Sequence, residues 1–502
     1  MQKKDVQYAD LGKRHNIRKI KRKEKMVNSE KVMHFFGELC KIPRASRDEK
    51  AVSDYLVKFA EDRNLEHYQD DMYNVIIKKP ATVEGAGEPV ILQGHIDMVY
   101  VKAEGSDHVY ENGLELMEDD EFYFANGTSL GADNGIAVAY TLAILDSDEI
   151  AHPDLEAVFT VQEEIGLFGA EAVDMSKLNG TRFINIDSEE EGIFFTSCAG
   201  GLRSVIRWDV VTEKEEAETV PVTVSFSKLA GGHSGMNIAM GKGNALVLLG
   251  RLMYALKDSG VRVSGIDAPG KSNAIASAAS VCFHVKKEAL EEVKALIAKT
   301  EKDFQTELQY TDEIEFIITE GKAEAGADVY TDKLVNNIMK TLMLIPNGVF
   351  ANSFAIEGLV ETSMNMGSLA VEDGKLELGM SVRSSVATQK EFLKEKVRLI
   401  AEEYGDDVLF DGDYPGWQFK KESPLRDTAV AVYEKMFNKK AEVAAIHAGL
   451  ECGYFDAKKP GMDIISMGPD LFDVHSPKER MSKKSMENIW MYLQELLKEL
   501  AK

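Results

Sequence analysis

Three apolar segments of this chain end abruptly on ionisable side chains, and this recurring pattern constrains the fold more than any other feature. The segments are EPVILQGHID, VFTVQEE and RFINIDSEEE, which end near His95, Glu163 and Asp187. Each has the apolar composition of a buried strand. In α/β sheets, ligand sites collect outside the carboxyl ends of the strands. Because strand and helix patterns alternate through residue 187, the first part of the chain is predicted to form a layered α/β domain.

The adjacent carboxylates Glu163 and Glu164 interrupt one of these strands. Neighbouring strand residues face opposite sides, so both can approach one centre only where the backbone turns, which Gly166 and Gly169 permit. Two carboxylates this close repel each other unless a cation or a shared proton compensates them. With a cation, one carboxylate binds the metal and its neighbour moves protons for an activated water. The alternative is a solvated loop after a strand.

Three further sites carry residues of the same chemistry. His95 and Asp97 share a face of an extended chain, so Asp97 can hold the ring nitrogen of His95 that does not bind a metal; the alternative is a surface pair. Asp133 stands between a glycine-rich turn and a helix, where it either caps the helix or bridges two cations with its two oxygens. His475 lies in a loop flanked by proline, either as a surface residue or as a functional group.

Imidazoles and carboxylates in this mixture suit zinc or a similar divalent ion. With one bridging carboxylate, five side chains are enough to hold two such ions with water between them. The candidate metal ligands are His95, Asp133, Glu164, Asp187 and His475.

Composition narrows the class of protein. The chain has 502 residues, 44% hydrophobic and 28% charged, which predicts a soluble globular protein of two to four domains. It contains no apolar run of about 18 residues and no signal-like apolar stretch at the N-terminus, so no membrane span or secretion is expected. Its four cysteines are scattered, as in a reducing compartment, and a net charge of -25 argues against nucleic acid as a partner. These features predict a cytoplasmic protein.

The chain divides into four parts that differ in composition and in hydrophobic pattern. Residues 1–25 contain ten Lys or Arg and three acidic residues, so 1–27 are predicted to be a disordered basic extension. Two explanations are a role in localisation and a start codon that was misassigned upstream of Met26. An inserted α+β domain is predicted between catalytic parts at 28–199 and 416–502. It spans 200–415 and contains a repeated strand–helix pattern, SVCFHV with KEALEEVKALIA and GMSVRSSV with KEFLKEKVRLIA.

The motifs GHIDMV, GADNGIA, QEEIGLFGA, NIDSEE, GGHSG and DVHSP occur in this order. In these motifs the sequence resembles the co-catalytic zinc peptidase family that includes carnosinase, aminoacylase and peptidase T, from about Ser29 to the C-terminus. The resemblance implies a catalytic domain with a mixed sheet flanked by helices, and an inserted α+β lid that forms a homodimer. It also implies two zinc ions per subunit, with Co²⁺ or Mn²⁺ as substitutes.

The resemblance assigns a role to each metal-site residue. One zinc ion would be held by His95 and Asp187, the other by Glu164 and His475, with Asp133 bridging the two. Glu163 would be the general base, and Asp97 would orient His95.

The resemblance also implies four substrate-binding residues. His233 of GGHSG would come from the partner subunit of a homodimer and help to stabilise the oxyanion. Asn273 and Arg383 would bind the C-terminal carboxylate or the carbonyl oxygen of the substrate, and Gly449 would offer backbone atoms. For Arg383, a surface position on a strand is the alternative. Structural positions are expected for His284, His447 and Glu451.

The activity implied is zinc-dependent hydrolysis of dipeptides, preferentially Xaa-His substrates such as β-alanyl-histidine. Two alternatives share the metal centre, namely a deacylase of N-acyl amino acids and a di- or tripeptidase of broader specificity. A third is an inactive binding protein with the same fold. The presence of both Glu163 and Asp97 speaks against this third possibility.

Overall fold

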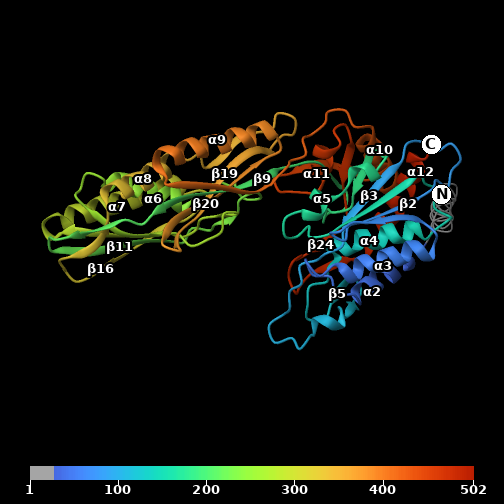
Figure 1. The fold of residues 1–502 in the computed structure, drawn as a ribbon, viewed down its shortest axis with the longest axis horizontal. Coiled ribbons are helices and arrows are strands. Elements are labelled where there is room, and N and C mark those ends of the chain that lie inside the picture. The colour runs from blue at the N-terminus through green and yellow to red at the C-terminus, as the bar shows by residue number, and fades with distance from the viewer. Residues whose placement is uncertain (1–27) are drawn as a thin grey trace, which may run out of the picture. The chain divides into compact units, whose positions relative to one another are not determined.

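The computed structural model describes residues 28–502, so the predicted basic extension lies outside the described residues. The chain forms two compact units (Figure 1). Unit 1 contains the described residues up to Thr196 together with Lys420–Ala444 and Tyr454–Lys502, and unit 2 contains Ser197–Phe419 and Ala445–Gly453. Unit 2 is therefore inserted into unit 1. The sequence pattern assigned Ala445–Gly453 to the catalytic part. In the structure this segment packs with unit 2, because its backbone and side chains form hydrogen bonds with residues of that unit.

Unit 1 is built on an eight-stranded mixed sheet. The neighbours β6, β3 and β7 run parallel to one another, and β23 continues the parallel run beyond β7. At the other edge, β1 and β2 pair antiparallel. The strands, in their order across the sheet, are β1 (Glu66–Gln69), β2 (Val75–Lys79), β6 (Leu155–Thr160), β3 (Val90–His95), β7 (Arg182–Asn185), β23 (Asp463–Ser466), β8 (Ile193–Cys198) and β22 (Glu442–Ile446).

Helices pack on this sheet and complete the α/β domain that the sequence predicted. They are α2 (Glu30–Cys40), α3 (Lys50–Asp62), α4 (Ala132–Leu145), α5 (Phe168–Ala172), α10 (Pro424–Phe437), α11 (Cys452–Lys458) and α12 (Lys483–Leu500). Serine side chains cap two of them, because Ser423 and Ser482 accept hydrogen bonds from backbone N–H groups of the first turns of α10 and α12. The mixed sheet flanked by helices is confirmed.

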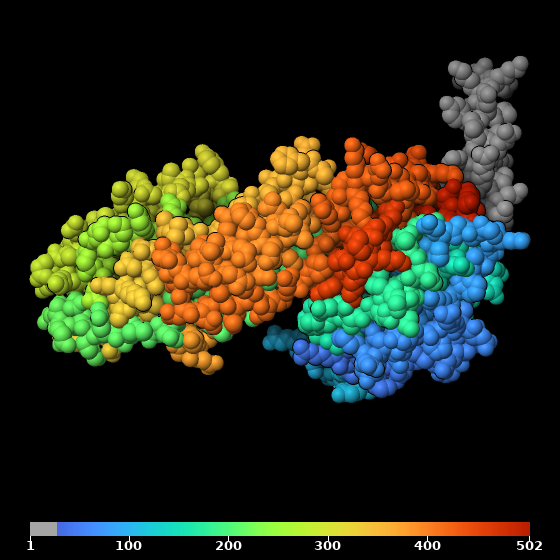
Figure 2. Space-filling model, turned by 45° about the horizontal axis from the view of Figure 1, so that its top comes forward, coloured from blue at the N-terminus to red at the C-terminus, as the bar shows by residue number. Residues whose placement is uncertain are grey.

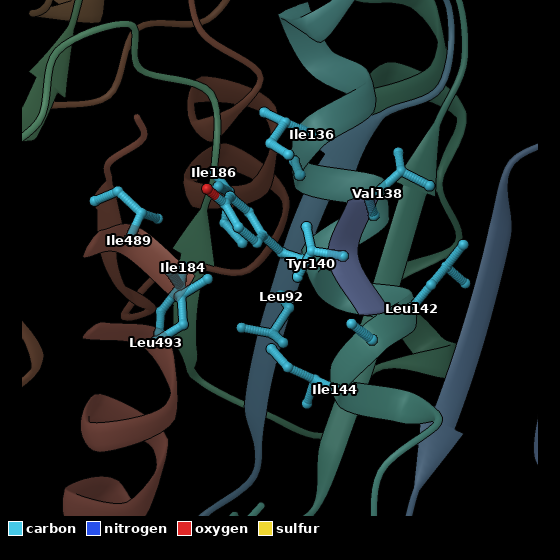
Figure 3. Packing of buried hydrophobic residues seen from close by; sticks show 14 of the residues in the cluster. Leu92, Ile136, Val138, Tyr140, Leu142, Ile144, Ile184, Ile186, Ile489 and Leu493 are labelled. Atoms are coloured by element: carbon cyan, nitrogen blue, oxygen red, sulfur yellow. The ribbon is translucent and has the colours of Figure 1, made fainter. Parts of the chain in front are cut away.

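The core of unit 1 forms where α4 crosses the sheet. Figure 3 shows Tyr140 and Ile144 of α4 close to Leu92 of β3, with Ile489 and Leu493 of α12 on the other side of Tyr140. Tyr140 stacks on Trp490 of α12 and donates a hydrogen bond to a backbone carbonyl of that helix. A Cβ on Gly94 would lie 2.6 Å from the Cβ of Ala137, so only glycine lets α4 lie this close to the end of β3.

The C-terminal segments are an integral part of unit 1. In the space-filling view the last residues, coloured red, lie against teal residues of the first part of the chain (Figure 2). They also complete a small antiparallel sheet beside the large one. Its strands are β24 (Leu471–Phe472), β25 (Arg480–Ser482), β5 (Phe122–Ala125) and β4 (Leu116–Glu118).

Unit 2 contains two antiparallel sheets. The five-stranded sheet is β18 (Gly348–Asn352), β19 (Val360–Glu372), β20 (Lys375–Ser384), β9 (Gly200–Asp209) and β21 (Asp407–Tyr414), and the four-stranded sheet is β13 (Arg262–Asp267), β15 (Ser280–Lys286), β11 (Thr219–Ser227) and β16 (Glu315–Glu320). Two short pairs join β10 (Thr212–Glu215) to β17 (Ala327–Tyr330) and β12 (Gly232–His233) to β14 (Ala274–Ile275).

Four helices pack against these sheets, namely α6 (Ala245–Leu256), α7 (Leu290–Leu308), α8 (Asp332–Leu344) and α9 (Ala387–Tyr404). Short 3-10 turns occur in unit 2 at η3 (Lys287–Ala289), and in unit 1 at η1 (Tyr110–Asn112) and η2 (Met175–Lys177). The repeated sequence pattern falls on β15 followed by α7 and on β20 followed by α9, one copy in each sheet. Among the described residues, no helix is both long and apolar enough to cross a membrane.

Candidate active site

Neighbouring strands bring three of the predicted segments together. His95 is the last residue of β3, the two glutamates follow β6, and Asp187 follows β7. Because β3 runs parallel to both neighbours, these residues leave the sheet at the same edge. Asp133 lies in the first turn of α4, where the backbone departs from helical geometry, and its side chain does not cap the helix.

The ring of His95 is surrounded by carboxylates. Its Nε2 atom lies 3.2 Å from Oδ1 of Asp133 and 3.5 Å from Oδ1 of Asp187. Its Nδ1 atom lies 3.3 Å from Oδ1 of Asp97. His95 is 1% exposed, so its orientation is set by these three acids.

His475 forms a second group with the other oxygen of the same aspartate. It lies in the loop between β24 and β25, and its Nε2 atom is 3.1 Å from Oδ2 of Asp133 and 2.9 Å from Oε1 of Glu164. The two oxygens of Asp133 therefore face two different imidazoles. All five predicted metal ligands converge in two groups that share this carboxylate.

The donor atoms fit two divalent cations. Around zinc, ligand bonds of about 2.0–2.1 Å in a tetrahedral arrangement place neighbouring donor atoms about 3.3 Å apart. The separations of the imidazole nitrogens of His95 and His475 from their carboxylate oxygens, 2.9–3.5 Å, match this spacing. Each group offers one imidazole and two carboxylates, which leaves a fourth position for water or substrate.

Asp97 links His95 to the paired glutamates. Besides the imidazole, its buried carboxylate accepts hydrogen bonds from the backbone N–H of Glu163 at 3.0 Å and from that of Glu164 at 3.3 Å, and from the hydroxyl of Ser46. Asp97 thereby fixes the turn after β6. Oε2 of Glu163 lies 4.0 Å from Nε2 of His95, at the edge of the group.

The electrostatics of the cluster favour cations. Burial disfavours a charged His95, but Asp187, Asp133 and Asp97 outweigh it and hold the pKa of His95 well above its usual value. Hydrogen bonds to Asp133 and Glu164 raise the pKa of His475 to about 11. Burial raises the pKa of Asp187 despite the nearby imidazole. The carboxylates attract positive charge, and this attraction is strongest next to the imidazole nitrogens of His95 and His475.

A second polar cluster lies within unit 2 around Arg383 of β20. The guanidinium Nε donates to the hydroxyl of Ser234 at 3.4 Å, and Nη1 donates to that of Tyr414 at 3.2 Å. Nη2 lies 3.4 Å from Nε2 of His233. Arg383 is 9% exposed, and among residues 28–502 no carboxylate lies within 4.0 Å of it. The predicted alternative of a surface arginine does not fit this burial.

Two histidines near Arg383 are neutral at pH 7. Burial, reinforced by the charge of Arg383, lowers the pKa of His447 to about 4, and the same two causes lower the pKa of His233. Nε2 of His447 lies 2.7 Å from the hydroxyl of Ser363. The cluster therefore holds a buried positive charge among neutral groups, an arrangement that suits a carboxylate ligand.

The remaining predicted substrate residues also lie in unit 2. The backbone carbonyl of Asn273 accepts a hydrogen bond from the N–H of Ser234. A Cβ on Gly449 would lie 2.8 Å from the ring of Tyr414, so glycine permits this close approach. Within unit 2, His233 contacts Arg383 of its own chain.

A profile of the family described as Peptidase family M20/M25/M40 matches residues 91–499. The chain belongs to this peptidase family. It is 32% identical to the cytosol non-specific dipeptidase of Escherichia coli (strain K12) over 468 residues, which cover 93% of this chain and 96% of that protein. Membership in the M20/M25/M40 family makes the protein a metallopeptidase, a hydrolase of peptide bonds, as predicted.

Two solved structures agree with the fold. An aminoacylhistidine dipeptidase from Vibrio alginolyticus matches with a TM-score of 0.87 and 33% identity, covering 93% of this chain and 96% of that one. An aminopeptidase from Bacillus cereus matches with a TM-score of 0.59 and 17% identity, covering 95% and 100% of the two chains. This second likeness concerns the fold alone.

Sequence reasoning missed several residues of the cluster in unit 2. His447 was assigned a structural position, yet it lies next to the charged cluster of unit 2. Ser234 could have been found, because it follows His233 directly in the GGHSG motif. Tyr414 and Ser363 gave no signal, since neither stands in a recognisable motif.

Proposed function

We propose that this M20/M25/M40 peptidase is a zinc-dependent dipeptidase that prefers Xaa-His substrates such as β-alanyl-histidine. The observation that carries the proposal is the pair of donor groups sharing Asp133, which fits two divalent cations. The names of the Escherichia coli and Vibrio alginolyticus relatives, a non-specific dipeptidase and an aminoacylhistidine dipeptidase, support dipeptides as the substrate class.

In this proposal His95 and Asp187 hold one cation, and Glu164 and His475 hold the other. Asp133 bridges them, and Asp97 fixes the ring of His95. When bound, the two cations supply an acidified water molecule and polarise the scissile carbonyl group. Zinc is the proposed metal because imidazole and carboxylate donors suit it, with Co²⁺ or Mn²⁺ as substitutes.

Glu163 is the proposed general base. Its carboxylate lies at the edge of the donor groups, 4.0 Å from His95, and is less buried than that of Glu164. It takes a proton from the attacking water at Oε2 and returns it to the departing amine. The hydrogen bonds that the carboxylate of Asp97 accepts from the backbone N–H groups of both glutamates keep the two side chains in their separate places.

Unit 2 is the proposed lid and supplies the substrate-binding residues. The buried guanidinium of Arg383 pairs with the C-terminal carboxylate of a short peptide. Asn273 binds the carboxylate or the carbonyl oxygen, and Gly449 offers backbone atoms. His233 stabilises the oxyanion. In this proposal the protein is a homodimer through unit 2, and the His233 that acts in one subunit's site comes from the partner subunit.

A cytoplasmic location completes the proposal. The Escherichia coli relative is named as a cytosolic enzyme, and the four cysteines of this chain are free. Free, mostly buried thiols are typical of proteins from reducing compartments.

A panel of substrates tests the proposed activity. Purified protein is assayed with β-alanyl-histidine, other Xaa-His dipeptides, unrelated dipeptides, tripeptides and N-acetyl amino acids, before and after chelation and with zinc, cobalt or manganese restored. Fastest hydrolysis of Xaa-His dipeptides, lost with chelator and restored by metal, is expected. Faster cleavage of N-acetyl amino acids would establish the deacylase, and chelator-resistant activity would contradict the metal-dependent mechanism.

An arginine variant tests the carboxylate site. Arg383→Met is expected to raise KM for dipeptides by about 10- to 100-fold, because a charge-assisted hydrogen bond is worth about 1.5–3 kcal/mol. Dipeptide amides, which lack the terminal carboxylate, should be little affected. Arg203→Met is the matched control, since Arg203 is exposed and pairs with Asp411. Equal KM increases for the free and amidated substrates would argue against this role.

A further inference from the structure

Glu479 is a buried carboxylate that none of the steps above uses. It is 2% exposed, and both of its oxygens accept hydrogen bonds from consecutive backbone N–H groups at the start of α4. Oε2 accepts from Leu130 at 2.8 Å and Gly131 at 2.9 Å, and Oε1 accepts from Ala132 at 2.8 Å and Asp133 at 3.3 Å. One side chain thus holds the whole segment that leads into the bridging aspartate.

These contacts favour the ionised form of Glu479 against the effect of burial, which raises the pKa of its carboxyl. All four partners are donors, so a proton on either oxygen would face an N–H group instead of an acceptor. Within the described part of the chain, no lysine or arginine nitrogen lies within 4.0 Å of this carboxylate. The negative charge is therefore compensated by backbone N–H groups and by the positive end of the helix dipole.

Glu479 connects the loops of two metal ligands. It lies four residues after His475, and its own N–H donates to the carbonyl of Ser476, which closes the turn between them. Its side chain then reaches the loop of Asp133. Nε2 of His475 and Oδ2 of Asp133 are 3.1 Å apart, so the carboxylate of Glu479 fixes the two loops whose side chains must face each other.

Other buried groups hold the same segment from its opposite side. Arg44 donates to the carbonyl of Gly131, whose N–H is bound by Glu479. Asn134 accepts from the N–H of His95 and donates to the carbonyl of Ile186, one residue before Asp187. These contacts fix the segment relative to His95 and Asp187, and the carboxylate of Glu479 fixes it relative to the loop of His475.

We propose that Glu479 is a positioning residue that sets the spacing of Asp133 and His475, and through it the affinity for the cation held by Asp133, Glu164 and His475. This inference rests on the proposed function, because it presumes the two-cation site. The competing role is purely structural, in which Glu479 only caps α4. The two roles differ in their effect on metal binding.

Glu156 provides the matched control. It is 3% exposed, and its carboxylate accepts hydrogen bonds from the backbone N–H groups of Asn179 and Gly180. It stands at the opposite end of β6 from the two catalytic-site glutamates. Glu156→Gln therefore removes a buried carboxylate that accepts backbone hydrogen bonds, together with its ion pair with Lys78, without touching a loop that carries a metal ligand.

Metal-free wild-type, Glu479→Gln and Glu156→Gln proteins are titrated with Co²⁺, and binding is measured by calorimetry and by visible absorption. The kcat, the KM and the midpoint of thermal unfolding of the three proteins are also compared. Glu479→Gln is expected to bind one of the two cations at least 10-fold more weakly, with an altered cobalt spectrum and an unchanged KM. Glu156→Gln should keep the wild-type cobalt affinities and spectrum, even where its thermal midpoint falls. Glu479→Asp, which keeps the charge on a shorter side chain, should show a smaller loss of affinity.

Wild-type affinity and spectrum in both Glu479 variants would overturn the positioning role, whatever their thermal stability. An equal loss of affinity in Glu156→Gln would do the same, since the effect would then be general. A wild-type protein that binds fewer than two cations would overturn the proposed function, and this inference with it.

Discussion

Glu163 and Glu164 are chemically identical neighbours that the turn after β6 places in different surroundings. The Glu164 carboxylate is 6% exposed and lies 2.9 Å from the imidazole of His475. That of Glu163 is 15% exposed and lies 4.0 Å from the imidazole of His95. The carboxylate of Asp97 accepts a hydrogen bond from the backbone N–H of each glutamate. Position, and not chemical type, therefore separates the proposed metal-binding carboxylate from the proposed general base.

This difference gives a prediction for two matched variants. Glu163→Gln should retain the bound metal and lose at least about 100-fold in kcat, because a general base contributes about 10²–10⁴-fold. Glu164→Gln should lose bound metal, since a carboxylate donor is replaced by a neutral amide. Metal content by elemental analysis and kcat on one dipeptide check both. A Glu163→Gln enzyme with near wild-type kcat would remove Glu163 from the base role.

At the scale of elements, the strand ends were predictable and the long-range contacts were not. An apolar run that stops at His95 or Asp187 marks both a strand and its end, because burial and charge change at one position. Glu479 and the N–H of Leu130 are 349 positions apart, and no local period encodes their contact. The return of Ala445–Gly453 to unit 2 has the same cause, since its contacts are with residues far away in sequence.

This returning segment carries a pH-sensitive residue. Burial and Arg383 lower the pKa of His447 to about 4, below its value of about 6.5 in an unfolded chain. Between these values the unfolded chain binds more protons, so stability is full above about pH 6.5 and is lost as the pH falls toward 4. The loss attributable to His447 should be about 2 kcal/mol at pH 5.

Urea denaturation at pH 7 and pH 5 checks this expectation. Wild type should lose more free energy of unfolding between the two pH values than His447→Gln, whose amide does not titrate. His34→Gln is the control, because His34 is exposed on α2 and should behave like wild type. An identical pH-dependent loss in wild type and His447→Gln would refute the assignment.

At the scale of the whole molecule, each unit carries one part of the proposed chemistry. The cation donors all belong to unit 1, although they come from segments as far apart as His95 and His475. The buried guanidinium and its neighbours all belong to unit 2. The family resemblance implied both sets of residues, and it implied that His233 serves the site of a partner subunit. That assignment is part of the proposed function.

Mixing two inactive variants tests this assignment. His233→Ala and Arg383→Ala proteins are co-expressed with different affinity tags, and any mixed oligomer is purified through both tags. If His233 acts from the partner subunit, one of the two sites in each mixed dimer contains a complete pair, and about half the wild-type kcat per mixed dimer is expected. Activity that stays at the level of the single variants would show that both residues act from one chain.

The central claim is that five side chains distant in sequence seat two divalent cations that share Asp133. Equilibrium titration of metal-free protein with zinc, followed by calorimetry, measures this most directly. Wild type is expected to bind two zinc ions per chain, and His475→Ala only one with wild-type affinity. Binding of one ion or none by the wild type, or of two ions with unchanged affinity by His475→Ala, would contradict the account.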